Sequence, residues 1–317
     1  MSEFDLIDRF FKKPASSAYL GIGDDAALLK PDKGCQLAIS TDMLVAGTHF
    51  LMDCQPYLIG WKSLAVNISD MAAMGADPRW ATLAIALPRK DEAWLEGFSN
   101  GFFDCAKQYQ VELIGGDTTR GPLNICVQII GEVPDGKALR RDGARAGDDI
   151  WVSGNLGDAA LALRGLQGQF DMDPEDLEAL RVKLEHPEPR VMLGSSLRDI
   201  ATSAIDISDG LVADLGHILK ASKSGAIVEF MDIPRSNTVS GYLQHDPVKA
   251  MVLSGGDDYE LCFTASPGHR DAILAIAEKL ALKLSRIGTV TDLGALTVLD
   301  SNQQPITLGK GGFDHFA

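Results

Sequence analysis

The residues of this chain that are best suited to chemistry are aspartates, and they gather in six places. Each place sets an aspartate beside glycine, serine or threonine: Asp24 and Asp25, Asp42, Asp70, Asp117, Asp206 with Asp209, and Asp257 with Asp258. Adjacent carboxylates repel one another unless water or cations neutralise them, and Mg²⁺ binds carboxylate and hydroxyl oxygens together with substrate phosphates. A single cluster is typical of a turn or a helix N-cap, but six clusters in one chain favour metal-assisted phosphate chemistry.

Other active-site patterns are missing or out of context. Residues 21–26 formally fit the dinucleotide-binding fingerprint, but two carboxylates would face the pyrophosphate there. The sequence has no P-loop, no protein-kinase signature, no serine-nucleophile elbow and no His-x-x-x-His pair for a transition metal. A nucleotide would therefore be held through metal-binding acids. Arg141, in one of the few basic clusters, is suited to bind phosphate oxygens bidentately.

Length, charge and cysteine content narrow the class of protein. The 317 residues suffice for two domains, and a net charge of -15 excludes a nucleic-acid backbone as an expected partner. The apolar runs are far shorter than the roughly 20 residues that cross a bilayer, and the acidic first residues are unlike an export signal, so we expect a cytoplasmic protein. Five cysteines without Cys-x-x-Cys spacing predict neither disulfides nor structural zinc.

Hydrophobic periodicity predicts an α/β N-terminal domain and an α+β C-terminal domain. In the first half we expect helices over 3–13, 56–74 and 91–109 and strands over 35–41, 80–87, 111–114 and 123–133. In the second half we expect helices from 158 and over 175–185, 190–200, 211–223 and 269–282, with strands over 150–153, 226–230, 259–264, 285–290 and 296–300. A polar, turn-rich linker at about 138–147 separates the expected domains 1–137 and 148–317. Several of the acids are expected where a strand ends.

Two short strings occur in the same order in both halves. Asn-Ile-Ser-Asp at 67–70 precedes Gly-Gly-Asp at 115–117, and Asp-Ile-Ser-Asp at 206–209 precedes Gly-Gly-Asp at 255–257. The strings are too short to establish a duplication. They predict that each half carries acids beside small residues. A cleft between the halves would bring the two sets of acids together.

Six strings together resemble the thiamine-monophosphate kinase family, within the aminoimidazole ribonucleotide synthetase-like ATP-binding superfamily. They lie at residues 23–27, 40–50, 60–72, 141–145, 206–211 and 311–316. The resemblance implies a homodimer whose N-terminal sheets pair across the interface, with that domain binding ATP and Mg²⁺, and an α+β C-terminal domain. It implies ATP as co-substrate, several Mg²⁺ ions, and phosphorylation of thiamine monophosphate to thiamine diphosphate with release of ADP.

The resemblance also assigns roles to single residues. It implies these metal ligands: Asp25, Ser40, Thr41, Asp42, Asp70, Asp117, Asp206 and Asp209. The implied nucleotide contacts are Gly116, Asp117, Arg141 and Ser208, and the implied contacts to thiamine phosphate are His49, Asp257 and Phe313. Of the acids, Asp42, Asp70, Asp117 and Asp209 are the predicted catalytic set. Relatives often carry Glu at 257 and Tyr at 99, and some carry Trp at 313, where this chain has Asp257, Ser99 and Phe313.

Two other functions fit the acids alone. A two-metal phosphatase would use the same carboxylates to activate water, and it would release phosphate from a small phosphomonoester without ATP. A non-catalytic cation-binding protein is a third reading, although the sequence has no EF-hand loop. For the kinase we expect direct in-line transfer, because no serine or cysteine has a histidine beside it as an activating base.

Overall fold

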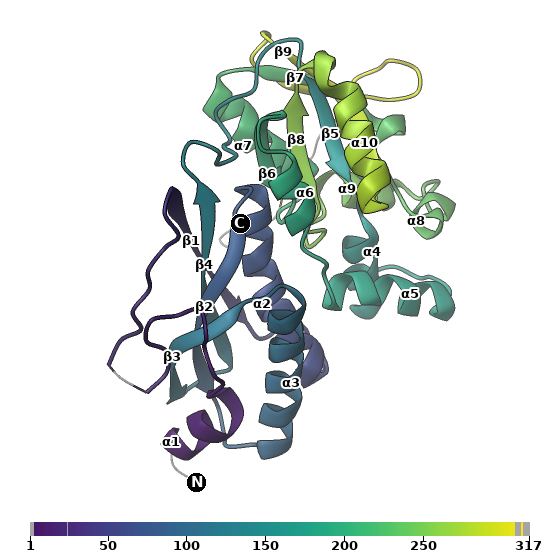
Figure 1. The fold of residues 1–317 in the computed structure, drawn as a ribbon. Coiled ribbons are helices and arrows are strands. Elements are labelled where there is room, and N and C mark those ends of the chain that lie inside the picture. The colour runs from purple at the N-terminus through teal and green to yellow at the C-terminus, as the bar shows by residue number, and fades with distance from the viewer. Residues whose placement is uncertain (1–2, 24, 308–311, 313–317) are drawn as a thin grey trace. The chain divides into compact units, whose positions relative to one another are not determined.

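The computed structural model describes residues 3–23, 25–307 and 312, and the chain divides into two compact units (Figure 1). The N-terminal unit comprises Met1–Met71 and Ala76–Gly136, and the C-terminal unit comprises Ala72–Gly75 and Lys137–Ala317. Among the described residues, no helix has the length and apolar character that crossing a membrane requires.

The N-terminal unit is built on a mixed four-stranded sheet of order β1-β4-β2-β3. Its strands are β1 (Cys35–Val45), β2 (Asp77–Leu87), β3 (Glu112–Arg120) and β4 (Asn124–Pro134). Strand β4 pairs antiparallel with β1 and β2, and β2 pairs parallel with β3. The two long helices are α2 (Pro56–Ala73) and α3 (Glu92–Gln108). They cross closely at Gly101, where a Cβ atom would lie 1.8 Å from the carbonyl oxygen of Tyr57.

The first residues of the chain pack onto this unit. The predicted helix at 3–13 begins as α1 (Glu3–Leu6) and continues as the π-helix η1 (Ile7–Phe11), which buries Phe10 and Phe11. The segment that follows places small apolar side chains against Trp80, Ile114 and Ile130 of the sheet. Glu112 of β3 fixes this segment, because its carboxylate accepts hydrogen bonds from the backbone and hydroxyl groups of Ser16 and Ser17.

The C-terminal unit has a six-stranded sheet of order β10-β7-β9-β5-β8-β6, in which only the β10–β7 pair is parallel. Its strands are β5 (Asp149–Ser153), β6 (Ala201–Asp206), β7 (Gly225–Glu229), β8 (Leu261–Ala265), β9 (Leu284–Thr291) and β10 (Leu296–Leu299). Strand β5 is buried at every position, because Ile150 and Val152 face one core and Trp151 faces the other.

The helices of this unit supply both cores. They are α4 (Asp158–Leu166), α5 (Pro174–Glu185), α6 (Val191–Ser196), α7 (Leu211–Ser222), α8 (Asn237–Gly241), α9 (Asp246–Ser254) and α10 (Arg270–Leu280), with the 3-10 turns η2 (Phe230–Asp232) and η3 (Pro267–His269). The larger core receives residues of α4, α5, α7, α8 and α9, and the smaller core receives residues of α6 and α10. The α/β plus α+β prediction is confirmed.

Three elements of the C-terminal unit escaped the sequence pattern. The sequence pattern predicts neither a helix nor a strand at β6, because Ala-Thr-Ser-Ala-Ile-Asp lacks alternating large apolar residues. Its buried hydroxyl group on Ser203 is satisfied by the hydroxyl of Thr264 on β8, at 2.6 Å. Helices α8 and α9 were also not predicted, and the helix predicted over 190–200 ends at Ser196.

Two strands of the N-terminal unit run further than predicted. Strand β1 continues to Val45, so Asp42 lies inside a strand and not at its end. Strand β3 continues to Arg120, so the Gly115-Gly116-Asp117 string is also within a strand. Pairing with β4 extends β1 through Asp42, and pairing with β2 extends β3 through Gly115, Gly116 and Asp117, residues whose local preference is for turns.

Candidate active site

One group of side chains whose oxygen atoms could bind a cation lies where β1 packs on α2. Ser40 Oγ donates a hydrogen bond to Asp70 Oδ2 at 2.5 Å, and the backbone amide of Asp42 donates to Asn67 Oδ1 at 3.1 Å. Ser40 and Asp42 are two residues apart on a strand and therefore share its helix-facing side. Asn67 is fully buried and donates to the carbonyl oxygen of Ser63 at 3.0 Å, so it is held rigidly. The sequence pattern gives Asn67 no role, although a polar amide within a largely apolar helix is a signal for one.

Thr41 and Asp117 lie on the opposite face of the same sheet. The pairing register aligns Asp117 with Ala84, then Cys126, then Met43 across the four strands, and Thr41 shares the face of Met43. The side chains of Thr41 and Asp117 are exposed. The structure therefore separates the hydroxyl of Thr41 from the adjacent Ser40 and Asp42 by the thickness of the sheet.

Gly116 is a position where the backbone itself requires glycine. Its φ is +153°, and a Cβ atom there would lie 1.9 Å from the carbonyl oxygen of Leu83. This close approach keeps β3 tight against β2 beside Asp117. A larger residue at 116 would displace the strand that carries the acid.

His49 lies in the turn after β1. Its Nδ1 accepts a hydrogen bond from the backbone amide of Val45 at 3.0 Å, and its own amide donates to the carbonyl oxygen of Val45 at 3.0 Å. An accepting Nδ1 is unprotonated, so a neutral ring carries its proton on Nε2. In this tautomer the Nε2–H group of His49 can donate a hydrogen bond.

Asp25 is exposed in a loop that two backbone hydrogen bonds close. The amide of Leu20 donates to the carbonyl oxygen of Leu28 at 3.2 Å, and the amide of Leu28 donates to that of Leu20 at 2.9 Å. Asp24 lies outside the described residues. Asp25 therefore lies exposed in a loop whose two ends are joined by backbone hydrogen bonds.

The acidic strings of the C-terminal unit lie against each other. Asp206 is the last residue of β6 and is buried. The carbonyl oxygen of Ser208 accepts the amide of Asp257 at 2.9 Å, and the carbonyl oxygen of Ile207 accepts the amide of Tyr259 at 2.8 Å. A Cβ atom at Gly256 would lie 2.2 Å from the carbonyl oxygen of Ser208. Within this unit the structure therefore brings together Ser208 and Asp257, which are 49 residues apart, and Asp206 pairs with Leu261 on β8.

The loop that carries Ser208 and Asp209 is also held from its other side. Asp214 Oδ2 accepts the amide of Ser208 at 3.1 Å and the amide of Asp209 at 3.0 Å. Burial raises the pKa of Asp214 to about 7, although these amide hydrogen bonds act in the opposite direction. Asp214 is not recognisable from the sequence, because an aspartate in the first turn of a helix is ordinary.

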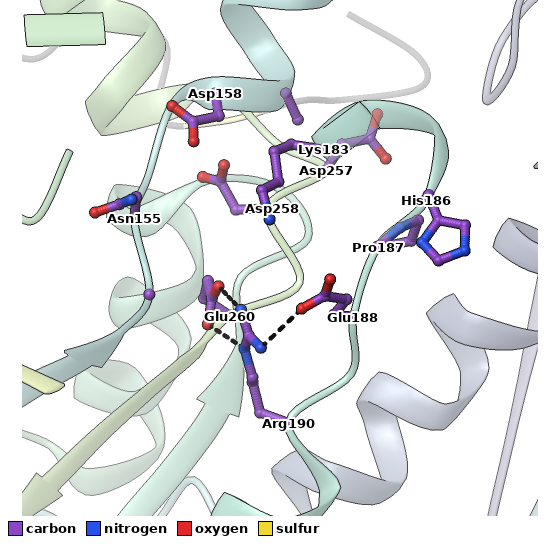
Figure 2. A pocket seen from close by; sticks show the side chains of 12 residues that line it. Asn155, Asp158, Lys183, His186, Pro187, Glu188, Arg190, Asp257, Asp258 and Glu260 are labelled. Carbon is purple, nitrogen blue, oxygen red and sulfur yellow. Dashed lines mark hydrogen bonds and ion pairs between the residues drawn. The ribbon is translucent and has the colours of Figure 1, made fainter. Parts of the chain in front are cut away.

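Asp257 borders a pocket of the C-terminal unit (Figure 2). The pocket has about 490 Å³ of unfilled space including its mouth, and it is lined mainly by ionisable residues: Asp158, Lys183, His186, Glu188, Arg190, Asp257, Asp258 and Glu260. Arg190 binds Glu260 through two hydrogen bonds of 2.7 and 2.5 Å, which fixes one wall. Burial raises the pKa of Asp258 well above its ordinary value, although its carboxylate accepts the amide of Gly157 at 3.0 Å.

Arg141 is exposed on a turn whose backbone is fixed. Ser222 Oγ donates to the carbonyl oxygen of Arg141 at 2.8 Å and accepts the amide of Ala144 at 3.1 Å. A Cβ atom at Gly143 would lie 1.8 Å from the carbonyl oxygen of Thr202, so the turn packs closely on β6. The guanidinium group of Arg141 therefore extends from a rigid base.

The remaining two positions, Phe313 and Ser99, are not placed in a site by the structure. Phe313 lies outside the described residues. Ser99 is buried within α3, where its hydroxyl donates to the carbonyl oxygen of Glu96 at 3.2 Å. The hydroxyl of Ser99 thus serves its own helix.

The donor chemistry of these residues fits Mg²⁺. Among the residues that the structure describes, no three His, Cys, Asp or Glu side chains approach closely enough to form a ligand group. The Ser40–Asp70 pair and the neighbouring Asp42 offer hydroxyl and carboxylate oxygens, as do Asp206 and Ser208 in the other unit. Oxygen donors suit Mg²⁺, whereas zinc sites draw on sulfur and imidazole.

Known proteins match the chain over almost its whole length. Residues 23–133 match the AIR synthase related protein, N-terminal domain, and residues 145–301 match the AIR synthase related protein, C-terminal domain. The thiamine-monophosphate kinase of Escherichia coli (strain K12) is 48% identical over 320 residues, which cover 99% of this chain and 98% of that protein.

Solved structures agree with this match. The crystal structure of thiamine-monophosphate kinase from Stenotrophomonas maltophilia K279a has a TM-score of 0.86 at 50% identity, covering 94% of this chain and 96% of that one. The structure of AaThiL complexed with AMPPCP and TMP has a TM-score of 0.79 at 30% identity, covering 99% and 96%. The acid-bearing strands and loops described above therefore stand in a chain that belongs to the thiamine-monophosphate kinase family of AIR synthase related proteins.

Proposed function

We propose that this chain transfers the γ-phosphoryl group of ATP to thiamine monophosphate, giving thiamine diphosphate and ADP. The observation that carries the proposal is the 48% identity to a thiamine-monophosphate kinase over 99% of the chain. The relative complexed with AMPPCP and TMP supports ATP and thiamine monophosphate as the two substrates. The acid-bearing segments of both units, held by hydrogen bonds, support a reaction among phosphate groups.

Several Mg²⁺ ions are the proposed cofactor, and when bound they supply neutralisation of phosphate charge. The residues proposed to hold them are Asp25, Ser40, Thr41, Asp42, Asp70, Asp117, Asp206 and Asp209. A chain with a net charge of -15 would otherwise repel ATP. The catalytic set within these ligands is Asp42, Asp70, Asp117 and Asp209.

Other residues bind and orient the substrates. Arg141 binds nucleotide phosphate oxygens bidentately from its fixed turn, and the backbones of Gly116 and Ser208 approach the nucleotide closely. His49 donates its Nε2–H to the phosphate of thiamine monophosphate, in keeping with the tautomer set by Val45.

Asp257 and its pocket are the proposed environment of the substrate's organic part. The thiazolium ring of thiamine is a permanent cation, and the pocket wall has more carboxylates than bases. The hydroxyl of Tyr259 donates to Asp257 Oδ1 at 3.0 Å and holds the carboxylate in place. Phe313 is proposed to stack on the heterocycle.

Transfer is proposed to be direct and in line, with no phosphoenzyme. The attacking group is the substrate's own phosphate, whose second pKa of about 6 leaves it ionised at neutral pH. It needs little help from a general base, so positioning by the chain's residues accounts for most of the catalysis.

A second copy of this chain is the proposed partner of β1. This 11-residue strand is at the edge of its sheet, and Leu37, Ile39 and Met43 on its outer face are 40%, 58% and 53% exposed. An exposed, apolar edge strand favours pairing with another sheet. Sedimentation velocity is expected to show a dimer that Ile39→Lys converts to monomer, and a monomeric unmodified chain would contradict the proposal.

The cytoplasm is the proposed location. Five free cysteines suit a reducing compartment that also supplies ATP and Mg²⁺.

A panel of phosphorylated acceptors tests the function. The purified chain is incubated with ATP, Mg²⁺ and each acceptor, and ADP and the phosphorylated product are quantified chromatographically. We expect ADP and thiamine diphosphate in equal amounts with thiamine monophosphate, and neither product without ATP. Release of inorganic phosphate from a phosphomonoester without ATP would instead identify a phosphatase.

A further inference from the structure

Asp214 is a buried carboxylate that contacts the Ser208–Asp209 loop but has no part in the proposed chemistry. Its side chain lies in the first turn of α7 and the residue is 3% exposed. A single oxygen, Oδ2, accepts both loop amides, at 3.1 and 3.0 Å. Because two consecutive amides converge on one atom, the backbone of Ser208 and Asp209 is fixed in one curvature.

The hydrogen bonds of Asp214 do more than cap its helix. A capping side chain accepts amides of the first helical turn, which in α7 begins at Leu211. Asp214 instead accepts amides that precede the helix. Gly210 at the N-cap position has no side chain to cap the helix, so among the described residues no side chain other than that of Asp214 is shown to accept these two amides.

The opposite edge of the loop is held by separate contacts. The carbonyl oxygen of Ser208 accepts the amide of Asp257, and the amide of Ile207 donates to the carbonyl oxygen of Glu260 at 2.8 Å. The 257–260 segment therefore holds the loop through the carbonyl oxygen of Ser208 and the amide of Ile207, and Asp214 holds it through the amides of Ser208 and Asp209. Removal of Asp214 leaves these two amides without their acceptor.

We propose that Asp214 is a positioning residue that holds Ser208 and Asp209 ready for the nucleotide and its cation. The inference rests on the proposed function, in which Ser208 contacts the nucleotide and Asp209 binds Mg²⁺. Without Asp214 the two amides lose their buried acceptor, and the loop must find the bound geometry during binding.

The first experiment uses the full chain without substrates. Amide hydrogen exchange is measured by NMR in the unmodified protein, in Asp214→Ala and in Asp214→Asn. We expect exchange at residues 208 and 209 to rise about tenfold or more in Asp214→Ala, as for a lost buried hydrogen bond. Asp214→Asn keeps an acceptor oxygen in the same place and should restore most of the protection. If Asp214→Ala does not fold, Asp214→Ser, which is too short to reach the loop, replaces it.

Asp149→Asn is the matched control. Asp149 is an equally buried carboxylate of the same unit, bound by Arg270 and Arg286. It pairs with Ala265 at one end of β8, whereas Asp206 pairs with Leu261 at the other end. Its loss therefore destabilises the unit away from the loop.

Kinetics give the second readout. In Asp214→Ala we expect the KM for ATP and the Mg²⁺ concentration for half-maximal rate to rise about tenfold, with the KM for thiamine monophosphate changed less than about twofold. Unchanged exchange at 208 and 209, or an equal rise in KM for ATP in Asp149→Asn, would overturn the proposal. Failure of the proposed function would appear separately, as an unmodified protein that makes no thiamine diphosphate while the exchange result stands.

Discussion

Replacing Asn67 by alanine tests whether the β1–α2 contact builds the catalytic geometry. The side chain of Asn67 joins two elements, since it accepts the amide of Asp42 and donates to the carbonyl oxygen of Ser63. The substitution removes both hydrogen bonds while leaving every proposed metal ligand in the chain. We expect losses of both stability and turnover.

The size of the stability loss follows from the two bonds. Asn67 is 0% exposed, so its hydrogen bond to Asp42 is worth about 1 kcal/mol net, and the unmatched amide adds to the cost. The carbonyl oxygen of Ser63 already accepts a backbone hydrogen bond within its helix. The bond from the Asn67 side chain to this oxygen therefore contributes only about 0.5 to 1 kcal/mol to stability. The expected loss in the free energy of unfolding is about 2 kcal/mol. Displacement of Asp42 is expected to lower kcat by about one to two orders of magnitude.

Urea unfolding followed by fluorescence and steady-state kinetics measure the two effects. Ser63→Ala is the control, because it deletes a buried hydroxyl bonded to the carbonyl oxygen of Gly60 but keeps the backbone acceptor that Asn67 uses. It should lower stability with kcat nearly unchanged. A fully active Asn67→Ala, or a Ser63→Ala that loses equal activity, would refute the reasoning.

Three other predictions concern single residues. Asp42→Asn is expected to lower kcat at least about a hundredfold with the fold intact by circular dichroism, because it removes a proposed cation ligand; near-normal turnover with Mg²⁺ would count against this. Phe313→Ala is expected to raise the KM for thiamine monophosphate more than the KM for ATP, and equal shifts would argue against stacking. Burial opposes ionisation of Glu112, but hydrogen bonds from Ser17 and Ser16 outweigh it and lower its pKa below the ordinary 4.5. Its stabilising contribution is therefore complete above that value and lost as pH falls through the folded pKa, so Tm measured against pH should fall less steeply in Glu112→Gln; identical profiles would contradict this.

Much of the fold could be predicted because local pattern and tertiary structure agree. Helices α2 and α3 and strands β2 and β4 match the predicted ranges within a few residues. Strand β6 could not be predicted, because its buried hydroxyl groups become acceptable only when Ser203 meets Thr264 across the sheet. Strand β1 likewise extends past Asp42 only because β4 pairs with it.

The candidate site was predictable in its residue types but not in its supports. Aspartate beside glycine or serine identifies oxygen donors from the sequence alone. The roles of Asn67 and Asp214 depend on which amide each side chain reaches, and those partners follow from packing. The separation of Ser40 and Thr41 on the two faces of β1 follows from alternation within the predicted strand, whereas the place of Asp42 inside β1 depends on the strand's extension to Val45.

The configuration at phosphorus in the product tests the central claim most directly. The chain is given Mg²⁺, thiamine monophosphate and ATP made chiral at the γ-phosphorus with oxygen isotopes, and the terminal phosphorus of thiamine diphosphate is analysed. A single in-line transfer predicts inversion, with the γ-phosphoryl group recovered in thiamine diphosphate. Retention of configuration, or recovery of that group only as inorganic phosphate, would contradict the account.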